Sequence, residues 1–378
     1  MVEGFTTSPD LREAVAIARR WTVDDTLFGI SWAPLAPTQI PYARLNASQS
    51  ATLFAAGKIA PLAPGTPIRS SCRGFLLPQE QKRRLRPIFE PLHNAVIQRD
   101  LLPPLTYPSR RERRLALWGR RYVALFDYAA YFDQIPLVEY VRGCHVLRLR
   151  PGAGLWVDGV EHTLVTLTRL PMGASQAPHV AQTLTWAVCE PLIAQGNVVI
   201  HTMIDNVALA ADDEETFVAA VRLFLRRSDA AGLTLNERDS IPSEAVDVAR
   251  WGEETARNFT FLGEVFVEGV GVSNTPRNLE KIHTAWQRMI DVPAAVTRRH
   301  VGALIGLLAW CAHTIDVCPA AHWGVLREFA DLAATPLGWD EPARLQPHAV
   351  NLLAAFVTVK NGSPLPTISF VNKWITEV

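Results

Sequence analysis

The chain contains, in this order, Phe126-Asp127, Leu170-Pro171-Met172-Gly173-Ala174-Ser175-Gln176-Ala177-Pro178 and Met203-Ile204-Asp205-Asn206. The first and last segments end the apolar runs at 122–126 and 198–204, which are typical of strands. Asp127 and Asp205 are 78 residues apart, and the glycine-containing middle segment lies between them. The order and spacing therefore predict two aspartates, each at the end of an apolar strand.

A pair of carboxylates at strand ends suits nucleotidyl transfer. In that reaction two divalent ions about 4 Å apart are held so that one activates the attacking 3′-oxygen and the other stabilises the leaving pyrophosphate. Mg²⁺ prefers oxygen ligands and keeps several waters, so few protein carboxylates are needed. From these residues we expect a template-directed polymerase with Asp127 and Asp205 at its metal site.

The composition predicts a folded, locally basic protein. The 378-residue chain is long enough for two or three sub-domains, and it is 48% hydrophobic and 20% charged. Its formal net charge is zero, but residues 69–121 contain thirteen Lys or Arg and four Asp or Glu, a net +9 over 53 residues. A local basic face of this kind binds phosphates. A solvated charged surface is the alternative interpretation.

The cysteines and the apolar stretches predict an intracellular protein. The five cysteines are odd in number and form no C-x-x-C pair, which favours a reducing intracellular compartment, cytoplasmic or nuclear, over a disulfide scaffold or a zinc site. The N-terminus lacks the apolar run of a signal peptide. The stretch Val301–Ile315 has 15 residues and contains a histidine, so we expect a buried helix and no membrane partner.

A hairpin with a cationic tip is expected from Gly74–Pro78 and Leu85–Phe89, joined by the polar loop at 79–84. Lys and Arg supply charge-assisted bonds to phosphate oxygens, so this loop is a candidate flap over a triphosphate. The remaining expected elements are a helix at 9–21, a hairpin of 146–150 and 155–157 with its turn at 151–154, a helix that Pro178 opens, a hairpin within 259–267 and a helical module over 279–332.

The strands at 198–204 and 207–211 are separated only by Asp205-Asn206. Both residues tolerate positive φ, so they predict a tight hairpin with Asp205 at an exposed tip.

The acidic run Asp212-Asp213-Glu214-Glu215 follows the second of these strands and precedes a helix predicted at 216–231. We interpret Asp212 as the N-cap, Asp212 with Glu215 as a capping box, and Gly232 as the helix stop. These acids are therefore assigned a structural role and not a catalytic one.

Together the segments resemble the ordered motifs of retroelement reverse transcriptases, from about Gly74 to about Leu332. Phe126–Leu137 resembles the first catalytic motif, Leu170–Pro178 the family's LP-x-G-x-x-x-(A/S)-P motif, and Met203–Asn206 falls where the family has aromatic-x-Asp-Asp. Further along, the resemblance includes Leu233–Asn236 after the palm helix, the primer-grip hairpin at Phe261, Leu262 and Gly263, and the thumb or connection at Arg298–Trp310. The most similar elements are long-terminal-repeat or tyrosine-recombinase elements of the DIRS and VIPER kind.

The resemblance implies an RNA-directed DNA polymerase, a nucleotidyltransferase that uses Mg²⁺ or Mn²⁺. Asp127 and Asp205 would bind the ions, together with the backbone carbonyl of Tyr128 and the side chain of Asn206. Phe132 would exclude a 2′-hydroxyl from the incoming sugar. The implied nucleotide-binding residues are Lys82, Arg83, Arg84, Arg86, Phe132, Met172, Gly173 and Gln176.

Three residues depart from the family pattern. Asn206 stands where a second aspartate is usual and keeps an oxygen without the charge. Met203 replaces the usual aromatic residue, and Arg238 stands near a common lysine position, where its higher pKa makes it a poorer proton donor. A catalytically degenerate, nucleic-acid-binding relic of the same fold is therefore the main alternative function.

The resemblance implies an α+β, right-hand polymerase fold with fingers, a palm containing an antiparallel sheet and a helical thumb. The implied division is 1–68 as an N-terminal extension, 69–268 as interleaved fingers and palm, 269–335 as thumb or connection and 336–378 as a segment of unknown role. The implied partners are a primed RNA or DNA template and deoxynucleoside triphosphates, with an RNase H or a recombinase/integrase domain elsewhere in a polyprotein.

Other enzyme classes have little support. The C-terminal 45 residues contain three acids, too few for the carboxylate cluster of a two-metal nuclease or an RNase H. Gly269-Val270-Gly271 lacks the third glycine and following helix of a dinucleotide-binding turn. No H-E-x-x-H or G-x-S-x-G sequence is present, which argues against metalloproteases and serine hydrolases.

Overall fold

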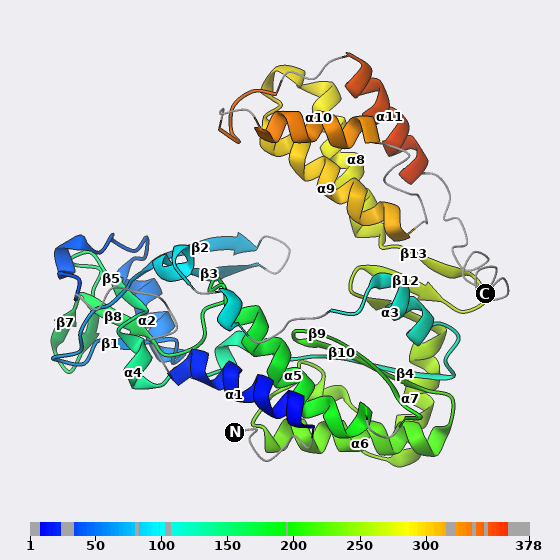
Figure 1. The fold of residues 1–378 in the computed structure, drawn as a ribbon, viewed down its shortest axis with the longest axis horizontal. Coiled ribbons are helices and arrows are strands. Elements are labelled where there is room, and N and C mark those ends of the chain that lie inside the picture. The colour runs from blue at the N-terminus through cyan, green and yellow to red at the C-terminus, as the bar shows by residue number, and fades with distance from the viewer. Residues whose placement is uncertain are drawn as a thin grey trace. The chain divides into compact units, whose positions relative to one another are not determined.

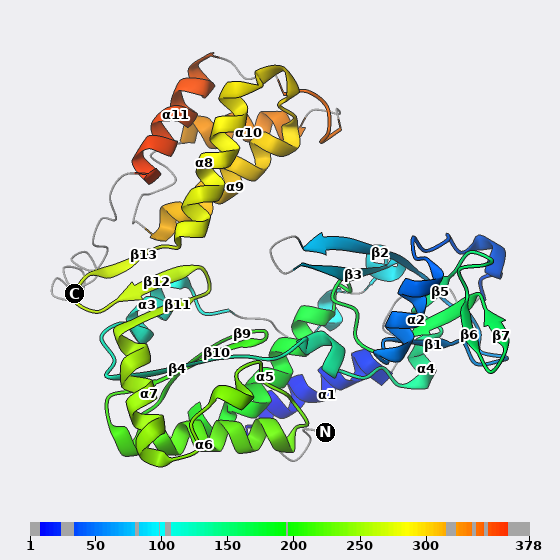
Figure 2. The same ribbon diagram turned by 180° about the vertical axis from the view of Figure 1, so that it is seen from behind.

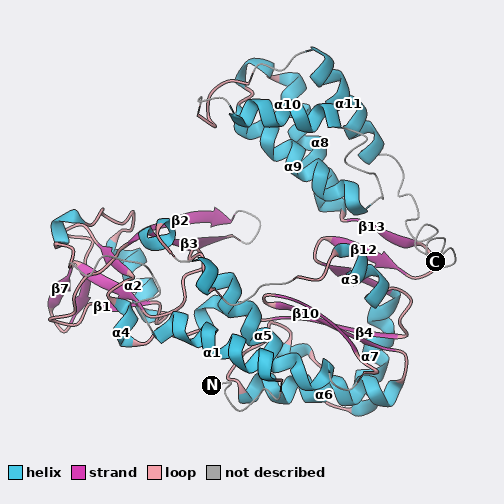
Figure 3. Cartoon of the chain, in the orientation of Figure 1, coloured by secondary structure: helices cyan, strands magenta, loops and turns pink. Residues whose placement is uncertain are grey.

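The computed structural model describes residues 8–23, 34–79, 83–97, 99–102, 107–193, 196–314, 323–334, 338–343 and 347–361. Helices and strands are mixed along this part of the chain (Figures 1 and 3), as predicted for an α+β fold. The chain divides into two compact units. The first contains residues 1–107, 126–209 and 218–241, and the second contains 108–125, 210–217 and 242–378.

The N-terminal helix of the first unit confirms the prediction for 9–21. It is α1 (Pro9–Val23), and it packs against α5 (Ala177–Ile193), the helix predicted to open near Pro178. Trp21 is fully buried, and its indole N–H donates to the backbone oxygen of Leu101 at 3.2 Å. The short helices that connect the strands of this unit are η2 (Pro37–Gln39), α2 (Ala47–Ala55), η4 (Leu92–Ala95), η5 (Arg99–Leu101), η6 (Tyr131–Gln134), α4 (Glu139–Arg142) and η7 (Arg238–Ser240).

The predicted flap hairpin is confirmed as β2 (Cys72–Gln79) and β3 (Arg84–Pro91), which are antiparallel in continuous register from Cys72↔Pro91 to Gln79↔Arg84. Figure 2 shows the two strands as a long ribbon that projects beyond the helices around it. Residues 80–82 of the tip lie outside the described residues.

The hairpin predicted from 146–150 and 155–157 is wrong. β5 (Val146–Arg148) pairs with β8 (Leu164–Leu167), which also pairs with β1 (Ile59–Pro61), whereas β6 (Leu155–Val157) pairs with β7 (Val160–His162). Asp158 and Gly159 connect β6 to β7 with φ of 50° and 79°. Two positive φ angles are the requirement of a type I′ turn, so Asp-Gly forms the hairpin that the longer 151–154 turn does not.

The catalytic-motif strands form a three-stranded sheet in the order β4 (Tyr122–Asp127), β10 (Asn206–Ala211), β9 (Val199–Met203). The predicted turn at Asp205-Asn206 is shifted by one residue, because β10 already begins at Asn206. Ile204 and Asp205 make the connection, and Ile204 adopts a φ of 57°. A β-branched residue is rarely found there, so sequence preference alone favours the wrong pair.

The acidic run after β10 is structural, as predicted, but the capping residue differs. The helix is α6 (Glu214–Ala230), and Asp213 is its cap, because the Asp213 carboxylate accepts a 2.7 Å bond from the Thr216 backbone N–H. Asp212 instead forms an ion pair with Arg120 at 2.6 Å. Gly232 follows the helix with a φ of 71°, which confirms the predicted stop.

The second unit contains a three-stranded antiparallel sheet and a helical module. The sheet is β11 (Asn258–Phe261), β12 (Glu264–Val267) and β13 (Gly271–Asn274), which confirms the hairpin predicted within 259–267. Its other elements are α3 (Arg110–Leu117), α7 (Ala245–Arg257), α8 (Pro276–Asp291), η8 (Pro293–Ala295), α9 (Arg298–Thr314), α10 (Trp323–Ala334) and α11 (Pro347–Asn361).

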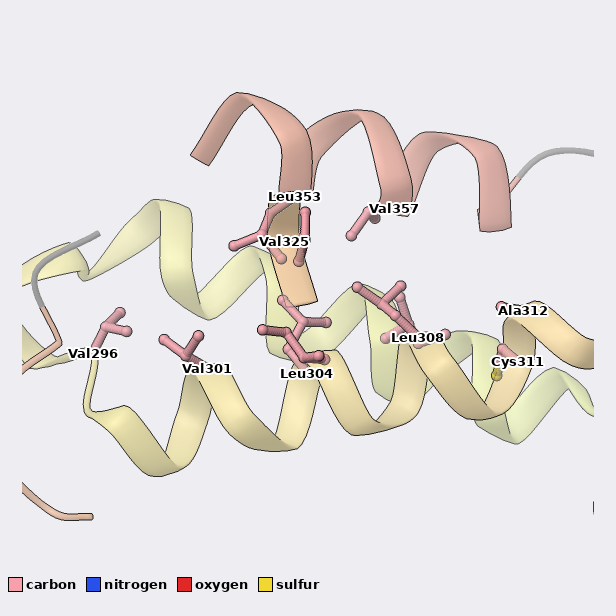
Figure 4. Packing of buried hydrophobic residues seen from close by; sticks show 11 residues of the cluster. Val296, Val301, Leu304, Leu308, Cys311, Ala312, Val325, Leu353 and Val357 are labelled. Atoms are coloured by element: carbon pink, nitrogen blue, oxygen red, sulfur yellow. The ribbon is translucent and has the colours of Figure 1, made fainter. Parts of the chain in front are cut away.

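The helical module has its own apolar core. Val301, Leu304 and Leu308 of α9 lie along one face and pack against Val325 of α10 and Leu353 of α11 (Figure 4). The stretch predicted as a buried helix is therefore confirmed by α9. Within the described residues, no helix is both long and apolar enough to span a membrane.

Candidate polymerase site

Asp127 and Asp205 come together in the first unit. Asp127 ends β4, and Asp205 lies in the turn before β10. The Tyr128 backbone N–H donates to the Asp205 backbone oxygen at 2.9 Å, so the two acid-bearing segments are direct neighbours. Both residues are half-buried. The predicted pair of carboxylates therefore shares one end of the β4–β10–β9 sheet.

Two side chains of α5 hold the turn that contains Asp205. The Gln182 side-chain oxygen accepts from the Ile204 N–H at 2.6 Å, and the Thr185 hydroxyl donates to the Ile204 carbonyl at 2.5 Å. Gln182 also donates to Thr202 of β9 at 2.9 Å. A left-handed conformation at a non-glycine residue costs about 1–3 kcal/mol, and these bonds stabilise it.

The segment after α6 surrounds Asp127. The Asn236 amide donates to the Asp127 carboxylate at 2.7 Å, and the Asn236 backbone N–H donates to the Asp127 carbonyl at 2.8 Å. The Glu237 carboxylate accepts from the Asp127 backbone N–H at 3.1 Å. On the other acid, the Asn206 amide donates to the Asp205 carboxylate at 2.9 Å. Each aspartate therefore receives a bond from one asparagine amide.

Buried tyrosines support the strand end from behind. Tyr128 and Tyr131 stack with ring centroids 4.8 Å apart, and their hydroxyls bond to Ser228 and Thr185 at 2.9 and 2.8 Å. Burial raises the pKa of both phenols well above the ordinary value, so they remain protonated hydrogen-bond donors. Phe132, the predicted sugar gate, is half-buried with its ring 6.3 Å from that of Tyr131.

Two of the predicted nucleotide-binding segments also come together. The Arg86 guanidinium of β3 lies 3.9 Å from the Met172 sulfur. Gly173 sits against the same strand so closely that a Cβ would lie 2.4 Å from the Phe89 carbonyl oxygen, which only glycine allows. The Asn94 amide fixes this segment, because it donates to the Gly173 carbonyl at 2.8 Å and accepts from the Ser175 N–H at 2.9 Å.

The remaining predicted nucleotide-binding residues differ in accessibility. Arg83 is exposed, whereas Lys82 and the side chain of Arg84 lie outside the described residues. Gln176 is fully buried, and neither atom of its amide has a hydrogen-bond partner within the described part of the chain. Its role toward a nucleotide stays a prediction.

The predicted primer grip lies in the second unit. Leu262 and Gly263 form the β11–β12 turn with φ of 48° and 81°, and Phe261 is buried. The Asn278 amide of α8 donates to the Gly263 carbonyl at 3.5 Å, and a Cβ at Gly263 would lie 3.5 Å from the Trp310 indole. The hairpin tip therefore packs against α8, which contains Asn278, and α9, which contains Trp310.

The donor atoms at the sheet end fit a hard cation. The Asp127 and Asp205 carboxylates and the Tyr128 carbonyl are oxygen donors, which suit Mg²⁺ and Mn²⁺. Within the described residues, Asp205 forms no ion pair with a basic side chain, so its charge is available to a cation. In that same part of the chain, no three His, Cys, Asp or Glu residues lie close enough to form a metal site by themselves. Substrate oxygens and waters would complete the coordination.

Sequence reasoning assigned no role to several residues that shape this site: Asn94, Gln182, Thr185, Asn236 and Glu237. One signal was present for the α5 pair, because Gln182 and Thr185 lie on the buried face of an otherwise apolar helix. Buried polar side chains need partners, so such residues indicate a backbone group to be satisfied nearby. Asn94 lies in the short helix η4 and Glu237 in the turn before η7, and neither position gives a comparable signal.

Comparisons with known proteins confirm the predicted right-hand polymerase fold. Residues 74–263, half of the chain, match the family model described as reverse transcriptase (RNA-dependent DNA polymerase). No curated protein sequence matches the chain. The fold is similar to that of the foamy viral protease-reverse transcriptase in two solved structures.

In the first of these structures, the dRH form of the foamy viral protein is in complex with double-stranded DNA. The likeness has a TM-score of 0.54 and 13% identity over 96% of this chain and 59% of that one. The second is the complex with an RNA/DNA hybrid, with a TM-score of 0.56 and 13% identity over 89% and 40% of the two chains. The chain therefore spans 59% or less of the length of these relatives.

Proposed function

Since the chain belongs to the reverse transcriptase (RNA-dependent DNA polymerase) family, we propose that it extends the 3′-hydroxyl of a primer with deoxynucleoside triphosphates on an RNA template. The observation that supports this most is the meeting of Asp127 and Asp205, joined through the 2.9 Å bond between their segments. Oxygen-only donors without a basic partner at Asp205 suit the two-metal chemistry of nucleotidyl transfer.

Asp127, Asp205 and the Tyr128 carbonyl would bind Mg²⁺ or Mn²⁺, which supply activation of the primer oxygen and stabilisation of the pyrophosphate. Asn236 and Asn206 orient the two carboxylates by donating one amide N–H to each. Gln182 and Thr185 hold Asp205 at the sheet end by bonding both backbone groups of Ile204. These four residues take no part in the reaction itself, and their role is to hold the two carboxylates in position.

The flap would bind the triphosphate. The half-buried Arg86 lies beside the exposed Met172, so a guanidinium of the flap and the Met172–Gly173 segment are neighbours in the first unit. Arg and Lys bind phosphate oxygens through charge-assisted bonds. Phe132 would select deoxynucleotides, because an aromatic ring beneath the sugar leaves no room for a 2′-hydroxyl.

A catalytically degenerate nucleic-acid-binding protein is the second candidate. It is favoured by Asn206, an amide where the family has a second aspartate. Such a protein would keep salt-sensitive template binding and lose metal-dependent extension.

We further propose that the chain belongs to a retrotransposon of the DIRS or VIPER kind, with an RNase H or a recombinase/integrase domain elsewhere in a polyprotein. This rests on the resemblance of Arg298–Trp310, which forms most of α9. A tyrosine recombinase encoded beside this chain would support the assignment, and an integrase beside it would favour an ordinary long-terminal-repeat element.

Primer extension tests the proposed activity. The intact protein is compared with Asp127→Ala and Asp205→Ala on a primed RNA template, with Mg²⁺ and with Mn²⁺. Extension by the intact protein that is lost in both variants supports a reverse transcriptase. No extension with either ion, together with salt-sensitive template binding, favours the degenerate protein. Extension that survives both substitutions means that the active site lies elsewhere.

A further inference from the structure

Glu237 lies next to Asp127 and has no assigned role. Its carboxylate accepts a 3.1 Å hydrogen bond from the backbone N–H of Asp127. An acidic side chain therefore contacts the backbone of an aspartate that would bind a cation. The neighbouring Asn236 bonds the Asp127 side chain, so residues 236 and 237 together contact both the main chain and the carboxylate of Asp127.

The charge of Glu237 is not neutralised by the protein within the described residues. The adjacent Arg238 forms its ion pair with Asp229 at 2.8 Å and not with Glu237. Asp205 likewise forms no ion pair with a described basic side chain. Both carboxylates are half-buried, so their charges add to the negative potential at this end of the sheet.

Asn206 removes a negative charge from the same sheet end, where the family pattern has aspartate. We propose that Glu237 is a positioning residue that supplies this missing negative charge from the opposite segment. The inference rests on the proposed function. Glu237 binds no ion itself; it strengthens the field that attracts cations to Asp127 and Asp205 and holds the Asp127 backbone.

Glu237→Gln separates the charge from the hydrogen bond. The glutamine oxygen still accepts from the Asp127 N–H, so only the charge is lost. Asn206→Asp restores a charge at the family position without touching residue 237. Asp239→Asn is the matched control, because Asp239 is an exposed acid in the short helix η7, which directly follows Glu237.

The test measures Mn²⁺ dissociation constants by electron paramagnetic resonance, with dideoxy-terminated primer–template and the next deoxynucleotide present. We expect Glu237→Gln to weaken Mn²⁺ binding about tenfold, and the Glu237→Gln, Asn206→Asp double variant to regain affinity to within about threefold of the intact protein. Asp239→Asn leaves the affinity unchanged. The Mg²⁺ concentration for half-maximal extension should follow the same order.

Two results would overturn the proposal. An unchanged Mn²⁺ affinity in Glu237→Gln shows that its charge is not used. A weakened affinity that Asn206→Asp does not restore, with thermal unfolding unaltered, shows a local structural role instead. If the intact protein binds Mn²⁺ but extends no primer, the proposed activity fails, and the same four dissociation constants still decide the role of Glu237.

Discussion

Acidic side chains in two regions of this molecule have opposite surroundings. Glu264, in the second unit, is fully buried and bonded by two arginines, with Arg114 at 2.6 and 3.1 Å and Arg113 on its other oxygen. Asp205 and Glu237, in the first unit, are half-buried and form no ion pair with any described basic side chain. In the first of these regions the acid is neutralised inside the core, whereas the second region is the proposed cation site.

The difference shows how to separate structural from functional acids in a chain of this kind. A buried carboxylate persists when paired cations offset its desolvation, and removal of one partner then destabilises the fold. The half-buried carboxylates of Asp205 and Glu237 have no such partners, and their negative charges are available for the proposed binding of divalent ions. Substitution of Glu264 should therefore lower stability, whereas substitution of Asp205 or Glu237 should lower activity.

The largest expected effect is on extension by Asp205→Asn. We expect extension to fall by about 10⁴-fold, on the order of 5 kcal/mol of transition-state stabilisation, because a metal-binding carboxylate is lost. The midpoint of thermal unfolding should stay the same or rise, since a charge without a cation partner is removed. A parallel loss of stability would place Asp205 with the structural acids and break the comparison.

Glu264→Gln should lower the stability of the protein and leave primer extension nearly unchanged. Two buried guanidinium groups would lose their shared carboxylate, which costs about 3–5 kcal/mol of the free energy of unfolding. Urea unfolding measures this loss. At a temperature where the variant remains folded, its extension rate should stay close to that of the intact protein; a selective loss of activity would contradict the structural assignment.

The same pair predicts a pH dependence of stability. Burial by itself raises the pKa of Glu264, but Arg114 and Arg113 outweigh it and hold the pKa below the ordinary 4.5. The stabilising contribution is therefore fully present above about pH 4.5 and is lost as the pH falls through the pKa of the folded state. The difference in urea midpoint between the intact protein and Glu264→Gln should be largest at pH 7 and shrink toward pH 3.

The smallest effects concern the acids before α6. Asp213→Ala should lower the thermal midpoint by about 2–4 °C, because the helix loses its N-cap bond. Asp212→Ala should change it less, because an exposed ion pair with Arg120 contributes little. Neither should affect extension. Equal effects on stability would weaken the assignment of the cap to Asp213.

Local patterns predicted much of the fold. The apolar run of β4, the apolar stripe of α5, the two strand-like runs of β2 and β3 around a polar loop, and the uncharged stretch of α9 each follow from neighbouring residues. The errors arose where local signals competed. Asp158-Gly159 is a stronger hairpin turn than 151–154, and Asp213 stands one residue closer to the helix than Asp212 does.

The candidate site was only partly predictable. Its two aspartates end apolar strands, and a sequence pattern can find them. The turn at Ile204 could not be located, because hydrogen bonds from Gln182 and Thr185 overcome the backbone preference of a β-branched residue. Glu237 was missed for the same physical reason: its contact with Asp127 joins residues 110 positions apart, and no local pattern encodes it.

A crystal structure with Mn²⁺, primer–template and the next deoxynucleotide tests the central claim most directly. The anomalous signal of manganese would be measured at the sheet end. We predict peaks ligated by Asp127 and Asp205, with none at Glu264, Asp212 or Asp213. Saturating Mn²⁺ that leaves no peak between Asp127 and Asp205, or that binds at the acids before α6 instead, would contradict the assignment.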